Sequence, residues 1–208
     1  GKLGVRRYDE FEAATERGVS NIRAADGRTD RVPYTRFVIR ADTLAKEKIR
    51  IDQEHPSARF SLIQADERFF GVYNNTVFTP AEEVLAGFRD QIYHGLEALL
   101  RYSENGSKLA LVSREKVMGV EYNIIDLTDT QGRVTRFYVS AKSFRVMMLT
   151  YEENGVKYRR KFYDYNAAQG TLVPFRTVLW ADDKQVEETE VGTITFGQKV
   201  DEGLFSTP

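Results

Sequence analysis

The side chains that perform acid–base or metal chemistry are few in this sequence, and their spacing forms no familiar site. There is no cysteine, which excludes disulfides, thiolate metal sites and iron–sulfur chemistry. The two histidines are His55, at an expected turn, and His94, which we expect on the solvated face of a helix. His94 stands three residues before Glu97, but two such residues do not make a metal site. Carboxylates pair at 182–183 and 187–188 without a second cluster for calcium. We therefore predict no catalytic residue, no metal site and no cofactor.

Composition excludes two further classes of function. The chain has 208 residues, with 30 Lys and Arg against 31 Asp and Glu, so its formal net charge is −1. A nucleic-acid binder would show a basic excess, which is absent here. Hydrophobic residues make up 41% of the chain and no apolar run is long enough to span a bilayer. We expect one folded domain over residues 1–208 and a monomer.

Short segments of alternating hydrophobicity dominate the chain and are typical of strands. The expected strands cover residues 34–40, 47–53, 58–64, 68–78, 109–114, 120–128, 134–140, 144–151, 156–165, 171–180 and 186–196. Tight turns such as Glu153-Asn154-Gly155 join them, which favours an antiparallel meander. Residues 6–18 read as a short polar helix and 19–31 as a loop, so we expect an N-terminal helix and loop over residues 1–31.

Residues 79–104 read as one long amphipathic helix. Thr79-Pro80-Ala81-Glu82 is a capping box with proline at the first helical position, and Asn105-Gly106 supplies a stop. At about 100° per residue, the apolar side chains fall within an arc of about 120°. They are Val84, Leu85, Phe88, Ile92, Leu96, Leu99 and Tyr102. We expect a mainly β (α+β) fold, in which a curved sheet of about 10–11 strands wraps around this helix.

Several strands are apolar on both faces, so the helix alone does not cover them. In the strand over 144–151, Phe144, Val146 and Met148 alternate with Met147 and Leu149. The second face requires loops, a partner or a ligand. An ordinary two-layer core and a ligand cavity are both compatible with this pattern.

The C-terminal half carries an ordered series of strand motifs. They are Gly119-Val120-Glu121-Tyr122, residues 132–139, Phe162-Tyr163-Asp164-Tyr165, Gly170-Thr171-Leu172-Val173-Pro174, Ile194-Thr195-Phe196-Gly197 and Leu204-Phe205-Ser206-Thr207-Pro208. A strand ending in Leu-x-Pro, an isoleucine-containing strand and a final Phe-x-x-Pro resemble the outer-membrane lipoprotein-sorting (LolA/LolB-like) superfamily. Lys48–Asp52 is similar to the basic strand that precedes the helix in that family. The likeness covers most of residues 33–208, although Ala45-Lys46-Glu47 lacks the Arg-Pro pair of the carrier members.

The resemblance implies an unclosed antiparallel half-barrel, lidded by helices, with an apolar cavity for acyl chains. It also implies residence in the periplasm, with the signal peptide absent from this chain, since Gly1–Gly4 has no apolar signal stretch. We expect a non-enzymatic protein that binds a lipid or the acyl chains of a lipidated protein, as in outer-membrane lipoprotein sorting. The predicted ligand-binding residues are Phe88, Ile92, Leu96, Leu99, Phe137, Met147, Leu149, Phe175 and Trp180. A one-residue slip in strand register would reverse which strand residues face inward.

Two other functions stay open. An interaction or regulatory domain would engage an envelope protein through its convex face or an open sheet edge, and its apolar interior would be core alone. An enzyme with a shallow polar cleft would need carboxylates clustered with tyrosine or histidine, which the linear sequence does not show.

Overall fold

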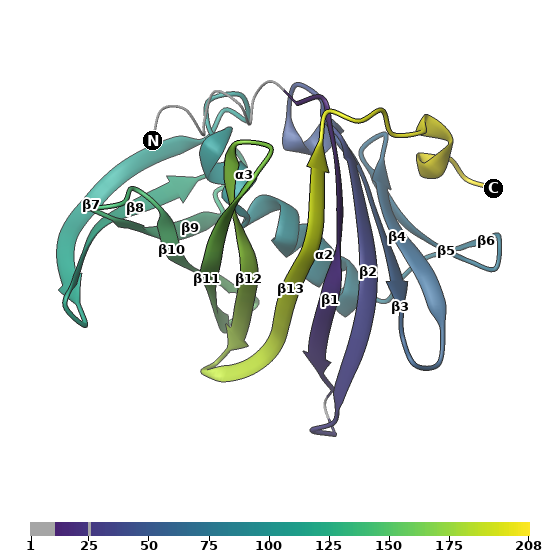
Figure 1. Cartoon of the computed structure of the whole chain (residues 1–208), viewed down its shortest axis with the longest axis horizontal. Coiled ribbons are helices and arrows are strands. Elements are labelled where there is room, and N and C mark those ends of the chain that lie inside the picture. Colours follow the sequence, from purple (N-terminus) through teal and green to yellow (C-terminus); the bar gives the residue numbers. More distant parts are fainter. Residues whose placement is uncertain (1–10, 25) are drawn as a thin grey trace.

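The computed structural model describes residues 11–24 and 26–208, which form one curved antiparallel sheet with helices on its inner side (Figure 1). Within these residues the sheet has thirteen strands. In chain order they are β1 (Ala13–Arg23), β2 (Thr29–Ile39), β3 (Lys48–Glu54), β4 (Arg59–Ala65), β5 (Arg68–Tyr73), β6 (Thr76–Phe78), β7 (Lys108–Val117), β8 (Val120–Thr128), β9 (Val134–Ser140), β10 (Val146–Glu153), β11 (Val156–Ala168), β12 (Thr171–Ala181) and β13 (Lys184–Phe196). The expectation of a mainly β, unclosed antiparallel fold is confirmed.

The strand order places the first and last strands, β1 and β13, side by side at the centre of the sheet. It runs β6-β5-β4-β3-β2-β1-β13-β12-β11-β10-β9-β8-β7, so each strand pairs with its sequence neighbour except where β1 meets β13. This β1–β13 seam extends from the pair Ala14–Phe196 to the pair Ile22–Glu187. It joins two meanders, β1–β6 and β7–β13, that are otherwise connected along the chain by the helical segment.

The N-terminal prediction is wrong over the described residues. Residues 13–23 form β1, which pairs with both β2 and β13, and β2 already begins at Thr29. The polar composition that favoured a helix and loop reflects the position of β1, because its inner face lines a partly polar pocket described below. The part of the expected helix before residue 11 lies outside the described residues.

The strand count exceeds the expected 10–11 for two reasons. The sequence predicts a helix and a loop where β1 lies. In addition, the expected strand over 68–78 is a hairpin of β5 and β6. Asn74 and Asn75 form its turn with φ of 46° and 56°, a left-handed conformation that asparagine tolerates. Apart from β1 and this hairpin, the predicted strands are present, with boundaries that differ by a few residues.

The expected helix over 79–104 is two helices, α2 (Glu82–Tyr93) and α3 (Leu96–Leu100). Gly95 separates them with φ −91° and ψ 176°, and a Cβ on it would lie 2.6 Å from the carbonyl oxygen of Gln91. The predicted capping box is also wrong, since α2 begins after Ala81 without a side-chain cap. A sheet wrapped around one long amphipathic helix is therefore not confirmed.

The main core lies between the helices and the inner face of the sheet. Phe88 and Ile92 of α2 pack there with Ile49 of β3, Phe137 of β9 and Leu149 of β10. These strands belong to both meanders, so α2 contributes to packing on each side of the β1–β13 seam.

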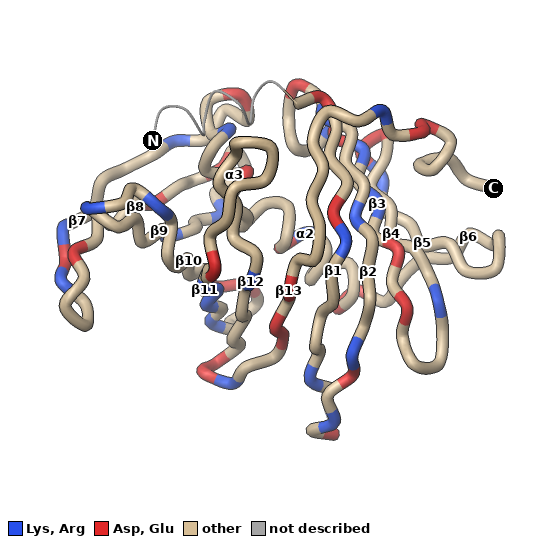
Figure 2. Tube along the Cα trace, in the orientation of Figure 1, with Lys and Arg blue, Asp and Glu red and all other residues tan. Residues whose placement is uncertain are grey.

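A second cluster lies at the C-terminal end of the chain. The short helix η2 (Glu202–Phe205) covers Ile63 with its Phe205 side chain, and Lys48 Nζ lies 2.7 Å from Glu202 Oε2. A further short helix, η1 (Leu44–Lys46), connects β2 to β3. Figure 2 shows basic and acidic residues interspersed along the strands, in keeping with the near-zero net charge.

Candidate ligand-binding site

A pocket of about 350 Å³ lies between the helical segment and the inner face of the sheet. Its walls come from β1, β2, β3, β11, β12 and β13, and from α2 and α3. This volume lies near the lower end of the range for small-molecule sites, roughly 300–1,000 Å³. The pocket therefore has room for one ligand and spans the β1–β13 seam.

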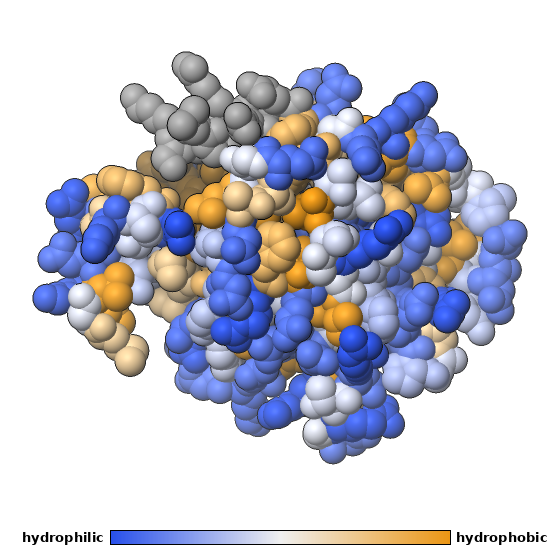
Figure 3. Space-filling model, viewed as in Figure 1, coloured by the Kyte–Doolittle hydropathy of each residue, from blue (hydrophilic) through white to orange (hydrophobic). Residues whose placement is uncertain are grey.

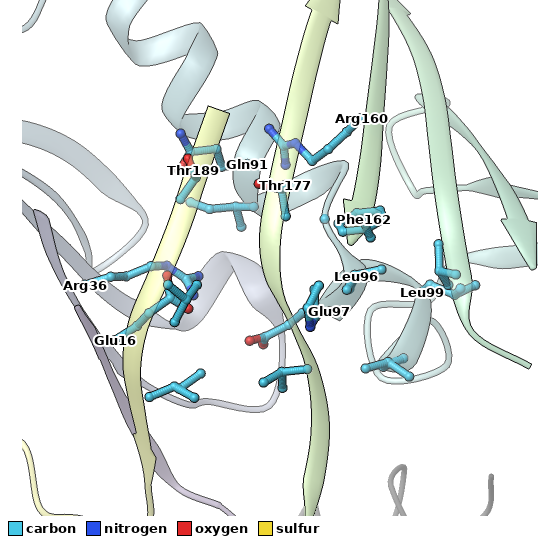
Figure 4. Close-up of a pocket in the computed structure, with 18 of the residues that line it drawn as sticks. Glu16, Arg36, Gln91, Leu96, Glu97, Leu99, Arg160, Phe162, Thr177 and Thr189 are labelled. Carbon is cyan, nitrogen blue, oxygen red and sulfur yellow. The ribbon is translucent and has the colours of Figure 1, made fainter. Parts of the chain in front are cut away.

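One wall of the pocket is apolar. It combines Leu96, Leu99 and Leu100 of α3 with Phe162 of β11 and Val173 of β12. In the close-up, Leu96, Leu99 and Phe162 lie together on one side of the pocket (Figure 4). This apolar wall is suited to a hydrocarbon chain.

The opposite wall is polar and comes mainly from β1, β2 and β13. Glu16 and Arg36 lie opposite one another in the β1–β2 register, and Figure 4 shows their side chains together. Tyr34 donates a hydrogen bond of 2.6 Å from its hydroxyl to Glu16 Oε1. Burial, reinforced by the neighbouring carboxylate of Glu16, raises the pKa of Tyr34, so this hydroxyl keeps its proton.

Gly18 makes room for this arrangement. A Cβ at Gly18 would lie 2.8 Å from the Tyr34 hydroxyl oxygen and 2.3 Å from the Glu190 carbonyl oxygen. Glycine at this position in β1 therefore lets the Tyr34 ring lie across the strand toward Glu16.

The polar wall continues across β13 and β12. Ser20 Oγ lies 2.8 Å from Thr189 Oγ1, and the two hydroxyls donate to Glu187 Oε1 at 3.1 and 2.9 Å. Arg160 of β11 and Thr177 of β12 also line this part of the pocket (Figure 4). Hydroxyls, carboxylates and guanidiniums therefore face the apolar wall across the cavity.

The rim of the pocket is apolar and exposed. Phe144, on the loop before β10, is 70% exposed, and Leu172 at the start of β12 is 40% exposed. Phe144 has φ of 56°, a left-handed conformation that is costly for an aromatic residue. Figure 3 shows hydrophobic side chains in the middle of the face that β11, β12 and β13 cross.

The whole chain superposes on solved structures. A DUF1329 family protein from Desulfovibrio piger gives a TM-score of 0.71 at 13% identity, with 99% of this chain and 95% of that chain covered. A LolA superfamily protein from Nitrosomonas europaea gives 0.66 at 10% identity, covering 99% and 96%. A domain from Vibrio parahaemolyticus, described as an outer-membrane lipoprotein-sorting protein domain, gives 0.58 at 10% identity, covering 98% and 96%. No protein-family model and no curated protein matches the sequence.

The fold is LolA-like. The structural neighbours are DUF1329 and LolA superfamily proteins, and they span essentially the entire chain. The resemblance suggested by the C-terminal strand motifs is thereby confirmed at the level of the fold.

The structure divides the nine predicted ligand-binding residues of this LolA-like fold into two groups. Ile92, Leu96 and Leu99 line the pocket. The others lie elsewhere, with Phe88, Phe137 and Leu149 in the main core, Phe175 against the cluster around Phe196, Met147 at a register shift in β10, and Trp180 beneath Arg159 and Lys161. The helix contributed the predicted residues that reach the pocket, because its apolar stripe does not depend on strand register.

The polar wall was missed by sequence reasoning. Glu16 and Ser20 lie on β1, which was assigned to a helix and loop, and Thr189 belongs to the polar strand β13. These residues alternate with outward-facing neighbours, as residues in a strand do. Because the inward-facing residues are polar, the hydrophobicity pattern does not reveal this alternation. On β12 the choice of face was also reversed, since Leu179 lines the pocket and Trp180 does not.

Arg101 ties α3 of the LolA-like fold to the connection between β2 and β3. Its guanidinium donates to the Glu47 carboxylate and to the Ala41 carbonyl oxygen, and its Nε lies 2.6 Å from Glu104 Oε2. The side chains of Arg101 and Glu47 are 5% and 1% exposed. Burial, with Glu97 as a second cause, raises the pKa of Glu47 to about 8, against the opposing effect of Arg101. The buried, hydrogen-bonded pair of Arg101 and Glu47 therefore holds α3 over the pocket.

His94 is buried, so its expected position on a solvated helix face is wrong. Its side chain is 2% exposed, its Nδ1 lies 2.6 Å from Thr135 Oγ1, and its ring stacks on Tyr151 with centroids 4.0 Å apart. The helical wheel failed here because α2 ends at Tyr93. Burial, and secondarily the charge of Arg133, lowers the pKa of His94 to about 4.

The buried His94 predicts acid-dependent stability. Its pKa falls from about 6.5 in the unfolded chain to about 4 in the folded one, so the unfolded chain binds the proton more readily. The stabilisation is complete above the unfolded pKa and is lost as pH falls through the folded pKa, a total of roughly 3 kcal/mol. We expect His94→Phe, which keeps the stacking surface, to remove this part of the pH dependence in urea unfolding. Parallel pH profiles for the variant and the wild type would contradict the assignment.

Among the described residues, no group of three or more histidine or acidic side chains is placed to hold a metal ion. The helices in this part of the chain are all too short or too polar to cross a membrane.

Proposed function

We propose that the pocket binds the acyl chain of a lipid or of a lipidated protein. The observation that carries this proposal is the pairing of an apolar wall, built largely by α3, with a polar wall on β1, β2 and β13. An amphipathic molecule matches both walls, since its chain removes apolar surface from water while its head keeps polar contacts. Each buried methylene contributes about 0.8 kcal/mol to such binding.

The fold supports this proposal. Solved structures of the same LolA-like fold include a domain described as lipoprotein-sorting. From this likeness in fold we propose that the protein is a non-enzymatic binding protein of the periplasm, and that it takes part in lipoprotein or lipid transfer.

We further propose that α3 acts as the lid of this site. Gly95 separates it from α2, and Leu96, Leu99 and Leu100 place three apolar side chains on the pocket. A ligand chain and the lid residues compete for the same apolar surface, so the lid exchanges with the ligand instead of trapping it.

A tryptophan that fills the cavity tests the proposal. We expect Leu99→Trp to weaken binding of the uncharged fluorescent probe N-phenyl-1-naphthylamine at least about tenfold, because the larger side chain occupies the space of the ligand. Val84→Trp is the matched control, since Val84 lies on α2, is 40% exposed and does not line the pocket. Both variants should unfold near the wild-type temperature. Equal probe affinities in wild type and Leu99→Trp would contradict the proposal, as would purified protein that binds no probe.

A protein-interaction role remains the alternative. The edge strand β7 exposes Leu111 by 67%, and Met118 at its hairpin turn is 97% exposed. However, β7 has a register shift between Leu111 and Ser113, and it carries Arg114 and Lys116. Bulges and basic residues are the features by which proteins protect open edges from pairing. The observations therefore favour the pocket.

A further inference from the structure

The charges of the polar wall balance. Glu16 and Arg36 face one another across β1 and β2. Arg160, Leu179 and Glu187 stand in one row across β11, β12 and β13, so the second carboxylate and the second guanidinium lie two strands apart. The wall therefore carries two carboxylates and two guanidiniums, with no excess of either charge.

The remaining charged residues of the pocket lie outside this wall. Glu47 pairs with Arg101, and Glu97 Oε1 lies 3.7 Å from Arg40, both at the base of α3. Arg145 belongs to the loop at the rim. Arg101 and Arg40 therefore balance the Glu47 and Glu97 carboxylates, and Arg145 adds one positive charge at the rim.

A row of hydroxyls lies between the charged groups. Ser20, Thr189 and Thr177 occupy directly paired positions on β1, β13 and β12. Ser20 and Thr189 each have one hydroxyl proton, and both donate it to Glu187, so their 2.8 Å contact is not a further hydrogen bond. These two hydroxyls can therefore accept from a hydroxyl-bearing group, while the Thr177 hydroxyl can donate or accept.

We propose that the polar wall selects an uncharged head group that carries hydroxyls, such as the glycerol of an acylglycerol. This inference rests on the proposed acyl-chain site and names the class of ligand that fits it. An anionic head would lie beside Glu16 and Glu187, and a cationic head beside Arg36 and Arg160. A net charge in this half-buried wall costs desolvation without a matching excess of opposite charge, whereas a polyol exchanges hydrogen bonds with the hydroxyl row.

Amphiphiles with the same dodecyl-length chain test the head-group preference. Monolauroylglycerol, laurate, dodecyltrimethylammonium and dodecylphosphocholine would each displace N-phenyl-1-naphthylamine from the full chain, below their micelle concentrations. We expect monolauroylglycerol to reach half-displacement at a concentration about tenfold lower than the other three. A lower value for any charged or zwitterionic amphiphile would overturn the head-group inference while leaving the acyl-chain site intact. If the probe and all four amphiphiles fail to bind, the acyl-chain site is overturned as well.

Single charge removals give a second readout. We expect Glu187→Gln to improve laurate displacement about threefold or more, and Arg160→Gln to do the same for dodecyltrimethylammonium, because each leaves an excess of the opposite charge. Glu188→Gln and Lys161→Gln are matched controls on the outer faces of the same strands, where Glu188 pairs with Arg176 and Lys161 lies over Trp180. Equal changes in the inner and outer variants would also overturn the inference.

Discussion

Replacing Arg101 with methionine should lower the free energy of unfolding by about 3–5 kcal/mol near about pH 9, where removal of the guanidinium leaves a buried carboxyl that must either carry an unpaired charge or take up a proton. The partner is Glu47, whose side chain is 1% exposed. The variant also loses the hydrogen bond to the Ala41 carbonyl oxygen, so both polar groups stay buried without the guanidinium. Urea unfolding measures the loss. The double variant Glu47→Met/Arg101→Met should recover most of it, because an apolar pair of similar size leaves no buried charge.

The same variant should show a defined pH dependence. Burial raises the pKa of Glu47 to about 8 even with Arg101 present, and removing Arg101 takes away a cause that lowers it. A raised carboxyl pKa contributes stability that is complete below the unfolded pKa and is lost as pH rises through the folded pKa. The deficit of Arg101→Met relative to wild type should therefore be larger near about pH 9 than near about pH 6. An equal deficit at both values would contradict the ion-pair assignment.

Phe137→Ala should cost about 3–5 kcal/mol of stability and leave the pocket functional. Phe137 is fully buried on β9, where it packs in the main core with α2 and β10. It was predicted from sequence as a ligand-binding residue, but it does not line the pocket. We expect the folded variant to bind N-phenyl-1-naphthylamine within about twofold of wild type, since Phe137 does not line the pocket.

A comparison with Leu96→Ala makes this experiment decisive. Leu96 contacts both the core and the pocket, so its truncation should weaken probe binding and cost less stability than Phe137→Ala. If Phe137→Ala abolished binding while the protein remained stable, Phe137 would belong to the site, and its assignment to the core would be wrong.

The features that sequence predicts well here are those with a local physical cause. Alternating apolar residues and short turns such as Asn154-Gly155 located most of the strands between β2 and β13, because each hairpin is specified by residues close in the chain. The apolar stripe located α2, although not its interruption. That interruption is a local backbone feature: a Cβ at Gly95 would lie 2.6 Å from the carbonyl oxygen of Gln91, four residues earlier, and a helical wheel of side-chain directions does not contain it.

The features that sequence did not predict depend on long-range pairing. β1 reads as polar because Glu16 and Ser20 face a pocket wall that comes from the other end of the chain. On β12, Val173, Thr177 and Leu179 face the pocket by simple alternation, and the sequence alone does not say which of the two faces of the strand points inward. Neither feature can be read from the residue types alone, so the polar half of the site could be identified only from the structure.

The β1–β13 seam joins strands that lie far apart in the chain, so we expect it to form late in folding. Glu16 and Ser20 of β1 complete their wall only with Glu187 and Thr189 of β13, and Ser20 and Glu187 are 167 residues apart in the chain. Closing so long a loop carries a large entropic cost and is slow. We therefore expect the two meanders to form before the seam closes. A ligand bound as proposed would contact both β1 and β13, so it would stabilise the seam against opening.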